Sequence, residues 1–224
     1  MATIRAAIFD AYGTLLDVHS AMARHAARLG PDWQALSAAW RGKQLEYSWV
    51  RSLAGPAHHL DFAEVTDLAL DWVAARHAIT DTALLADLRA AYRSLDAYPE
   101  VVATLTALRA AGLRTAVLSN GAPAMLEAGL QAAGIADLLD AVLSVEQVGV
   151  YKPDPRVYGL AERRFGLVAG QMAFLSSNPW DAFGARAAGF RVGWVNRSGA
   201  PDEYDLRGNV RELTDLAALP ELLT

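Results

Sequence analysis

The first apolar run of the chain, residues 4–9, leads directly into Asp10-Ala11-Tyr12-Gly13-Thr14-Leu15-Leu16. A short run of this kind, closed by a glycine-containing turn, is typical of a buried strand. A carboxylate at the carboxyl end of such a strand has rigid support behind it, with backbone amides and a hydroxyl ahead of it. Asp10 therefore meets the requirements of a covalent nucleophile, although an Asp that only caps a turn would have the same sequence around it.

Further apolar runs alternate with helical segments along the chain. Residues 114–118, 172–175 and 191–195 are candidate strands, and 141–143 is a weaker one. Three helical segments end on the same Ala-Ala-Gly sequence, at Gly112, Gly134 and Gly189, where glycine can adopt the left-handed turn that ends a helix. This alternation predicts an α/β fold of Rossmann-like type, with a parallel sheet covered by helices.

One region breaks this alternation. From about residue 18 to 95 the apolar spacing is helical, for example over 33–53 and 64–77, and no convincing strand occurs. A helical block inserted after the first strand would lie over the carboxyl ends of the strands, where open α/β sheets bind ligands. We therefore predict a catalytic core of residues 1–16 and 97–224, with a helical cap of residues 17–96.

The composition argues against several functional classes. The chain has 224 residues, a net charge of −5 and no cysteine. Without cysteine there is no disulfide, thiolate zinc site, iron–sulfur cluster or cysteine nucleophile, and an acidic chain is poorly suited to nucleic acid. The opening apolar run is too short for a signal peptide or a membrane span, so we expect a cytoplasmic protein without a membrane partner.

Four motifs occur in the order found in the haloacid dehalogenase superfamily. Asp10 with the Gly-Thr-Leu that follows is similar to its first signature, and Ser119 ends a second strand. Lys152 lies in a Tyr-Lys-Pro-Asp-Pro loop, and Ser176 to Asp181 follow a further strand. The matches span most of the chain, which is identified as a member of that superfamily.

Two departures from the superfamily pattern argue against its magnesium-dependent phosphatases. In those enzymes the residue two after the nucleophile is usually an Asp that protonates the leaving alkoxide; here it is Tyr12, a phenol with an ordinary pKa of about 10. Ser176 stands where the phosphatases have a magnesium-binding Asp. An Asp nucleophile without such an acid suits a leaving group that needs no proton, such as halide.

The cap segment Trp40-Arg41-Gly42-Lys43-Gln44-Leu45-Glu46-Tyr47-Ser48-Trp49 closely resembles that of the L-2-haloacid dehalogenases. This resemblance spans nearly the whole chain. It implies hydrolysis of short (S)-2-haloalkanoic acids to (R)-2-hydroxy acids and halide, through an ester of Asp10 with inversion at C2, and without a cofactor or metal ion. A magnesium-dependent phosphatase and a catalytically silent binding protein remain as alternatives.

The resemblance also implies a set of catalytic residues and a set of substrate-binding residues. The catalytic residues are Asp10, Thr14, Arg41, Ser119, Lys152, Tyr158, Ser176, Asn178 and Asp181. The substrate-binding residues are Tyr12, Arg41, Leu45, Phe62, Ser119, Asn120 and Trp180.

Several of these residues are expected to manage charge during the first chemical step. Arg41 would receive the halide, with Asn120 and Trp180 completing its cradle, although an exposed helix arginine is the commoner case. Lys152 would keep Asp10 ionised. Thr14 and Ser119 would hydrogen-bond to Asp10 or to the substrate carboxylate, unless they only cap their turn and strand.

Other residues are expected to serve the hydrolytic water or to shape the pocket. Asp181 is the natural base, with Ser176 and Asn178 positioning the water, unless Asp181 only caps the helix at 182–188. Tyr158 would support Ser176 or Lys152. An apolar pocket for the alkyl group is expected to be lined by Tyr12, Leu45, Phe62 and Trp180.

Two further expectations concern the pocket size and the assembly. Gly42 stands where relatives often carry a larger polar side chain, which would widen the pocket or loosen Arg41. The aromatic residues Trp40, Tyr47 and Trp49 exceed what one small cap needs, so we expect a homodimer.

Overall fold

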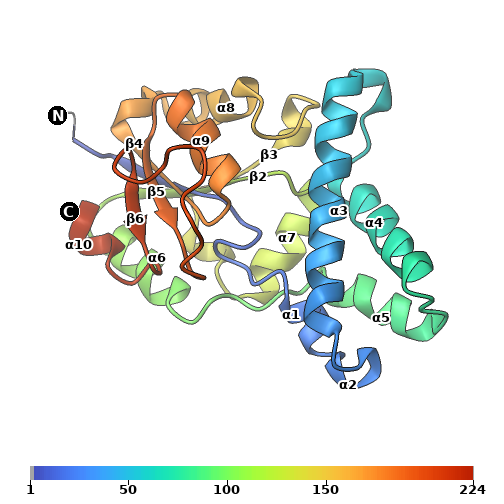
Figure 1. Cartoon of the computed structure of the whole chain (residues 1–224). Helices are drawn as coiled ribbons and strands as arrows, with labels where there is room; N and C mark the ends of the chain where they lie inside the picture. Colours follow the sequence, from blue (N-terminus) through green and yellow to red (C-terminus); the bar gives the residue numbers. More distant parts are fainter. Residues whose placement is uncertain (1–2, 224) are drawn as a thin grey trace.

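The computed structural model describes residues 3–223, so residues 1–2 and 224 of the predicted core lie outside the described residues. Its centre is a six-stranded sheet in the order β3-β2-β1-β4-β5-β6, and every neighbouring pair is parallel (Figure 1). The strands are β1 (Ala6–Phe9), β2 (Arg114–Ser119), β3 (Ala141–Ser144), β4 (Met172–Ser176), β5 (Arg191–Val195) and β6 (Arg211–Leu213). The predicted parallel α/β fold is confirmed.

All five predicted strands are present, and one more occurs. β1 begins at Ala6 rather than at residue 4, while β2, β3 and β4 each extend one residue beyond the prediction. The additional strand, β6, has three residues at the edge of the sheet, of which Arg211 and Glu212 are exposed. Because most of β6 faces solvent, it has no apolar run by which the sequence could reveal it.

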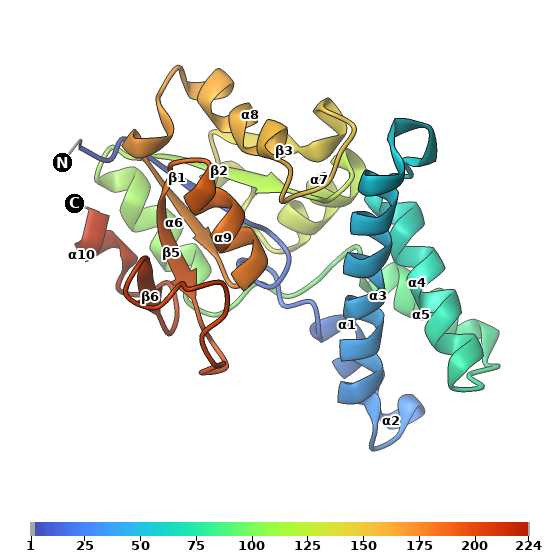
Figure 2. The ribbon, with the colours of Figure 1, turned by 45° about the horizontal axis from the view of Figure 1, so that its top comes forward.

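Helices cover both faces of the sheet. On one face α8 (Pro155–Phe165) and α9 (Pro179–Ala187) pack together, and on the other lie α6 (Val101–Ala110) and α10 (Leu219–Leu223) (Figure 2). Another helix, α7 (Pro123–Ala132), follows β2. The three Ala-Ala-Gly sequences do end helical segments, and their glycines have φ values of 79°, 68° and 90°.

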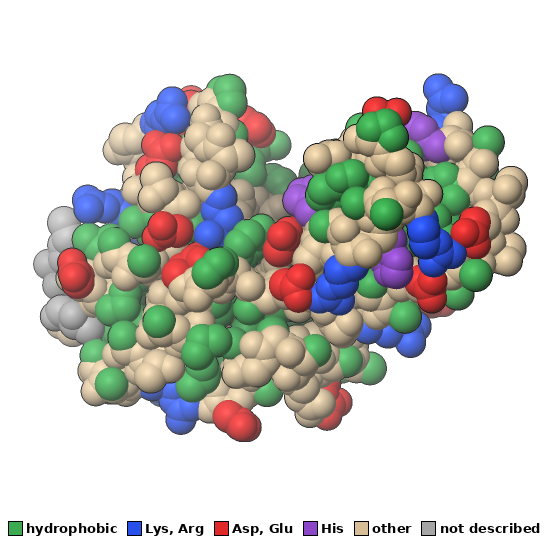
Figure 3. All heavy atoms as spheres, turned by 90° about the horizontal axis from the view of Figure 1, so that it is seen from below, with side chains coloured by type: hydrophobic (Ala, Val, Ile, Leu, Met, Phe, Trp, Pro, Cys, Tyr) green, Lys and Arg blue, Asp and Glu red, His purple; other side chains and the backbone are tan. Residues whose placement is uncertain are grey.

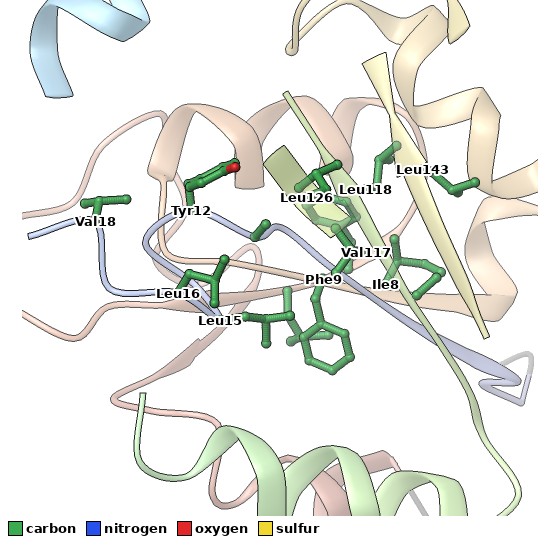
Figure 4. Close-up of a cluster of buried hydrophobic side chains, with 14 of the residues drawn as sticks. Ile8, Phe9, Tyr12, Leu15, Leu16, Val18, Val117, Leu118, Leu126 and Leu143 are labelled. Carbon is green, nitrogen blue, oxygen red and sulfur yellow. The ribbon is translucent and has the colours of Figure 1, made fainter. Parts of the chain in front are cut away.

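The main apolar core lies around β1. Ile8 and Phe9 are fully buried, as are Val117 and Leu118 of β2, and Figure 4 shows these four side chains close together. Burial of each such side chain contributes about 1.5–3 kcal/mol. The carboxyl end of β1 is therefore a rigid support for the residue that follows, Asp10.

The chain between β1 and α6 forms a separate group of helices beyond the carboxyl ends of the strands (Figures 1 and 2). These helices are α1 (Ser20–Ala23), α2 (Ala26–Leu29), α3 (Trp33–Ala54), α4 (Phe62–Arg76) and α5 (Thr82–Ala91). The two longest, α3 and α4, pack against each other. The helices expected at 33–53 and 64–77 are confirmed, and the second begins earlier because Asp61 and Glu64 form a capping box. The division into a core and a cap as separate domains stays a prediction.

Helix length and the charges on one face of the molecule bear on possible membrane and polyanion partners. Within residues 3–223, every helix is too short or too polar to cross a membrane. On the face drawn in Figure 3, Lys and Arg side chains lie among Asp and Glu rather than in one positive patch.

Candidate active site

The site forms where three neighbouring strands end. Asp10 follows β1, Ser119 ends β2 and Ser176 ends β4, and β1 lies between the other two strands. β2 and β3 lie on one side of β1, whereas β4, β5 and β6, which come later in the chain, lie on its other side. Such a switch point at the carboxyl ends of parallel strands is where open α/β sheets bind ligands.

Three donors surround the Asp10 carboxylate, which is only 4% exposed. Lys152 Nζ lies 3.1 Å from Oδ1, while Asn178 Nδ2 at 2.8 Å and Thr14 Oγ1 at 3.3 Å donate to Oδ2. An environment made only of donors matches a carboxylate anion, which only accepts hydrogen bonds. Asp10 is thus held as an oriented anion.

Lys152 connects the two buried carboxylates of the site. Its side chain is fully buried, and Nζ lies 3.1 Å from Asp10 and 2.9 Å from Asp181 Oδ2. The backbone is fixed as well, because the Lys152 amide donates to Asn120 Oδ1 at 3.0 Å. The expectation that Lys152 pairs with Asp10 agrees with this geometry, and its second partner is Asp181.

Asp181 lies in the first turn of α9 and is fully buried. Burial raises the pKa of its carboxyl group above the ordinary value, Lys152 lowers it, and the charge of Asp10 raises it further. A carboxylate with a raised pKa is a better general base near neutral pH than an exposed one. The alternative that Asp181 caps the helix does not hold, because the cap position is occupied by Asn178.

Tyr158 orients Asp181 rather than the residues that we expected. Its hydroxyl donates to Asp181 Oδ1 at 2.8 Å, and no bond joins it to Ser176 or Lys152 among the described residues. Burial raises the pKa of Tyr158 well above its ordinary value, so the phenol stays protonated and donates. The expectation for Tyr158 was wrong in its partner, because α8 packs on α9 beside Asp181.

The loop after β4 joins the nucleophile to its neighbours. The backbone amide of Ser177 donates to Thr14 Oγ1 at 2.8 Å, and the Asn178 amide group also donates to the Tyr12 carbonyl at 3.1 Å. Ser176 Oγ accepts from the backbone of Asn178 at 3.2 Å. Thr14 and Asn178 therefore contact Asp10 directly, whereas Ser176 shapes the loop that carries Asn178.

Arg41 reaches this site from the helical group. It lies on α3, half-buried, and its guanidinium donates to Tyr12 O at 3.4 Å, Asn178 Oδ1 at 3.5 Å and Gln44 Oε1 at 3.5 Å. All three acceptors are neutral, and within residues 3–223 no carboxylate forms an ion pair with Arg41. Its positive charge is therefore available to an anion bound beside Asp10.

Aromatic side chains from both parts of the chain contact one another in two places, one of them at Tyr12, two residues after the nucleophile. The Tyr12 ring lies 5.6 Å from Phe62 and 5.9 Å from Tyr92, and Trp180 of α9 meets Trp49 of α3 at 5.4 Å. The fourth expected pocket residue, Leu45, is half-buried and follows Arg41 by one turn on α3. Burial raises the pKa of Tyr12, which makes it a still poorer acid than an ordinary phenol.

The remaining expected residues lie at the edges of the site. Ser119 Oγ accepts from the Gly121 amide at 3.1 Å and makes no bond to Asp10 among the described residues. Asn120 uses its side-chain oxygen for Lys152, which leaves its amide hydrogens for another acceptor. Gly42 is exposed, and a Cβ there would meet no atom within 4 Å. A side chain at this position would therefore lie on the surface of α3, and the expected effect of Gly42 on the pocket or on Arg41 stays a prediction.

Two groups that we did not predict support the site. Gln44 is fully buried beside Arg41 and bonds to Tyr92 at 3.0 Å. Arg197 donates to the Thr14 carbonyl at 3.0 Å and pairs with Glu100 at 2.6 Å, so it fixes the turn after Asp10. The sequence could have indicated that Gln44 is buried, since Trp40, Gln44 and Ser48 follow one another at four-residue intervals on one face of α3. No local sequence pattern marks Arg197.

The described residues do not provide a ready cation site. Among them, no three His, Asp or Glu side chains converge as metal ligands. Two carboxylates of the site, those of Asp10 and Asp181, are bridged by the Lys152 ammonium group. A positive group already belongs to the chain at the point where two carboxylates would otherwise attract a cation.

The chain is similar to known dehalogenases over its whole length. A family model described as haloacid dehalogenase-like hydrolase matches residues 4–189. The (S)-2-haloacid dehalogenase 1 of Pseudomonas sp. (strain CBS-3) is 45% identical over 224 residues, which are 100% of this chain and 98% of that protein.

Solved structures give the same result. A crystal structure of a dehalogenase superposes with a TM-score of 0.96 at 42% identity, over 100% of this chain and 98% of that chain. An L-2-haloacid dehalogenase from Xanthobacter autotrophicus, with chloropropionic acid covalently bound, superposes with a TM-score of 0.87 at 35% identity, over 99% of this chain and 98% of that chain.

Proposed function

The chain belongs to the haloacid dehalogenase-like hydrolases and, within them, to the (S)-2-haloacid dehalogenases, and we propose that it hydrolyses short (S)-2-haloalkanoic acids through an ester of Asp10. The products are the (R)-2-hydroxy acid and halide. The observation that carries this function is the oriented Asp10 anion, with three donors around it and the unpaired Arg41 charge nearby. The covalently bound chloropropionic acid of the Xanthobacter autotrophicus relative supports the ester intermediate.

The first step is a displacement at C2. A carboxylate oxygen of Asp10 attacks C2 opposite the halogen, the carbon–halogen bond breaks as the carbon–oxygen bond forms, and configuration inverts. The halide leaves with the electron pair and needs no proton, which agrees with Tyr12 in place of an acid. Arg41 supplies the charge that stabilises the departing halide, and such a preorganised donor is worth roughly 10² to 10³ in rate.

The substrate carboxylate has its own candidate donors. Asn120 and Ser119 lie at the carboxyl end of β2, and the Asn120 amide hydrogens have no acceptor among residues 3–223. We assign these two residues to the substrate carboxylate or halide, and the rings of Tyr12, Phe62 and Trp180 with Leu45 to the alkyl group.

The second step is hydrolysis of the ester. Asp181, oriented by Tyr158 and Lys152, takes a proton from a water that attacks the carbonyl carbon of Asp10. The acyl carbon–oxygen bond then breaks, and the proton on Asp181 passes to the leaving alkoxide of the hydroxy acid. The product carries an oxygen of Asp10, the water oxygen stays in Asp10, and the whole reaction releases one proton.

Three expectations about the whole protein remain proposals. The helices α1 to α5 would act as a cap that brings Arg41 over the core. Exposed apolar side chains on α3, among them Leu53 at 88% exposure, support a homodimer. A cytoplasmic location stays a prediction from the sequence.

A single turnover with excess enzyme in oxygen-18 water tests the proposed function. Halide released from L-2-chloropropionate should be matched by hydroxy acid without label, because the new oxygen comes from Asp10. Label in that first product would refute attack by Asp10, while phosphate-ester turnover that stops with a chelator would favour a phosphatase.

A further inference from the structure

A buried polar network lies behind Arg41 in the helical group. Gln44 is fully buried, and its side chain contacts residues of three different segments. Its Oε1 accepts from Tyr92 at 3.0 Å and from Arg41 at 3.5 Å, and its Nε2 donates to Thr66 Oγ1 at 3.1 Å. A buried amide is stable only when its donors and acceptors find partners, so this network specifies one arrangement of these side chains.

Thr66 determines which way the Gln44 amide faces. The hydroxyl of Thr66 donates its single proton to the Phe62 carbonyl at 2.6 Å. Towards Gln44 it can therefore only accept, which requires the NH₂ side of the amide to face Thr66. The Gln44 oxygen must then face Arg41 and Tyr92.

Tyr92 strengthens this orientation from the other side. It is 4% exposed, and burial raises the pKa of its hydroxyl, so it remains a protonated donor to Gln44. Its ring also lies 5.9 Å from that of Tyr12, at an interplanar angle of 20°. The network thus joins the Arg41 guanidinium to the aromatic wall next to Asp10.

The chemical type of Gln44 fits an Arg41 that must keep its charge. A carboxylate at this position would orient the guanidinium equally well, but it would also neutralise it and compete with halide. A neutral amide oxygen supplies direction without an opposing charge. The other two acceptors of Arg41, the Tyr12 carbonyl and the Asn178 amide oxygen, share this property.

The geometry points to Gln44, fixed by Thr66 and Tyr92, as the positioning residue that aims Arg41 at the leaving halide while leaving its charge free. This inference rests on the proposed function and adds residues that act through Arg41. It assigns to Gln44 an effect on the first chemical step alone, the release of halide.

Single-turnover halide release from 2-chloropropionate and 2-bromopropionate tests this role. For Gln44→Met we expect the rate constant to fall by about 10- to 100-fold, with a larger loss for chloride, whose smaller ion interacts more strongly with a guanidinium. Gln44→Glu should lose more, because it pairs with Arg41. The matched control is Gln34→Glu, the same change at an exposed position of α3, which should behave as the unmodified protein.

A second pair of variants separates positioning from folding. Thr66→Val removes the acceptor that orients Gln44, so it should slow halide release and slow chloride more than bromide, as Gln44→Met does. Thr66→Ser keeps the hydroxyl and should release both halides at the rates of the unmodified protein. Equal losses for the two halides, or losses that only follow the folded fraction, would overturn the inference. If the unmodified protein and Gln34→Glu release halide from neither substrate, the proposed function itself has failed.

Discussion

The ammonium group of Lys152 lies 2.9 Å from a carboxylate oxygen of Asp181, and both side chains are fully buried. Because Lys152 also contacts Asp10 at 3.1 Å, one cation separates the nucleophile from the proposed base. Two buried carboxylates without this cation would repel each other, and each would lose its compensating charge. The catalytic pair therefore depends on a residue that reacts with neither substrate nor water.

Replacement of this cation should affect both stability and chemistry. For Lys152→Met we expect the free energy of unfolding to fall by about 3–5 kcal/mol and halide release per folded molecule to fall by roughly 10²-fold or more. The control is Lys43→Met, because the half-buried Lys43 pairs with Glu46 and lies over the rings of Tyr47 and Trp72. That change should cost less than about 1 kcal/mol and leave turnover intact; similar activity of the two variants would contradict the role of Lys152.

Removal of the proposed base should stop the reaction at the ester. Asp181→Asn should still release halide, up to one equivalent per active site, and the intact protein should gain the mass of the 1-carboxyethyl group esterified to Asp10, because water is no longer activated. Mass spectrometry after mixing with L-2-chloropropionate measures this adduct. Asp154→Asn is the control, since Asp154 caps α8 and pairs with the exposed Arg156, and Asn caps equally well; an adduct that fails to accumulate in Asp181→Asn argues against the base.

Activity and stability should respond to pH in opposite directions through Asp181. Burial raises the pKa of Asp181 in the folded protein, so the stability that comes from its protonation is present below about pH 4, the ordinary value, and is lost as pH rises through the folded pKa. Decay of the ester instead requires the ionised base and should accelerate over that same rise. Denaturant unfolding measures the pH dependence of stability, and quenched single turnovers measure that of ester decay. In Asp181→Asn the part of each pH dependence that comes from Asp181 should be absent.

Tyr158 should contribute through the bond that it donates to Asp181. Hydrogen bonds to charged groups contribute about 1.5–3 kcal/mol, so Tyr158→Phe should slow decay of the ester by about tenfold or more and leave the release of halide unchanged. Gly184→Ala should act similarly, because a Cβ there would clash with the Tyr158 hydroxyl. Tyr204→Phe, at a half-exposed position, is the control. Slower halide release in Tyr158→Phe would contradict a role of Tyr158 that is confined to hydrolysis of the ester.

The fold was predictable because its signals are local. The apolar runs of β1, β2, β4 and β5 and the Ala-Ala-Gly ends of three helical segments each lie within about ten residues of sequence. β6 was missed because an exposed edge strand leaves no such run. The start of α4 was misplaced by two residues, since the capping box that sets it lies ahead of the apolar spacing.

The site was predictable only where a motif carries its residues. Asp10, Thr14, Lys152, Asn178 and Asp181 were expected, and the structure brings them within hydrogen-bond distance of one another in pairs. The partner of Tyr158 was wrong because it depends on how α8 packs on α9. Contacts such as Gln44 to Thr66 or Arg197 to Thr14 join segments far apart in the chain, and spacing alone does not reveal them.

The two stacked tyrosines of the site should differ sharply in their dependence on the hydroxyl. Tyr12 stands where an acid would serve a phosphatase, but a leaving halide takes no proton, and burial raises the pKa of Tyr12. Tyr12→Phe keeps the ring and should release halide within about threefold of the unmodified rate, since no transition-state bond is lost. Tyr92→Phe removes a donor to Gln44, so it should slow halide release and do so more for chloride than for bromide. Single-turnover measurements on both variants check this contrast, and a large loss for Tyr12→Phe would mean that its hydroxyl takes part in the displacement.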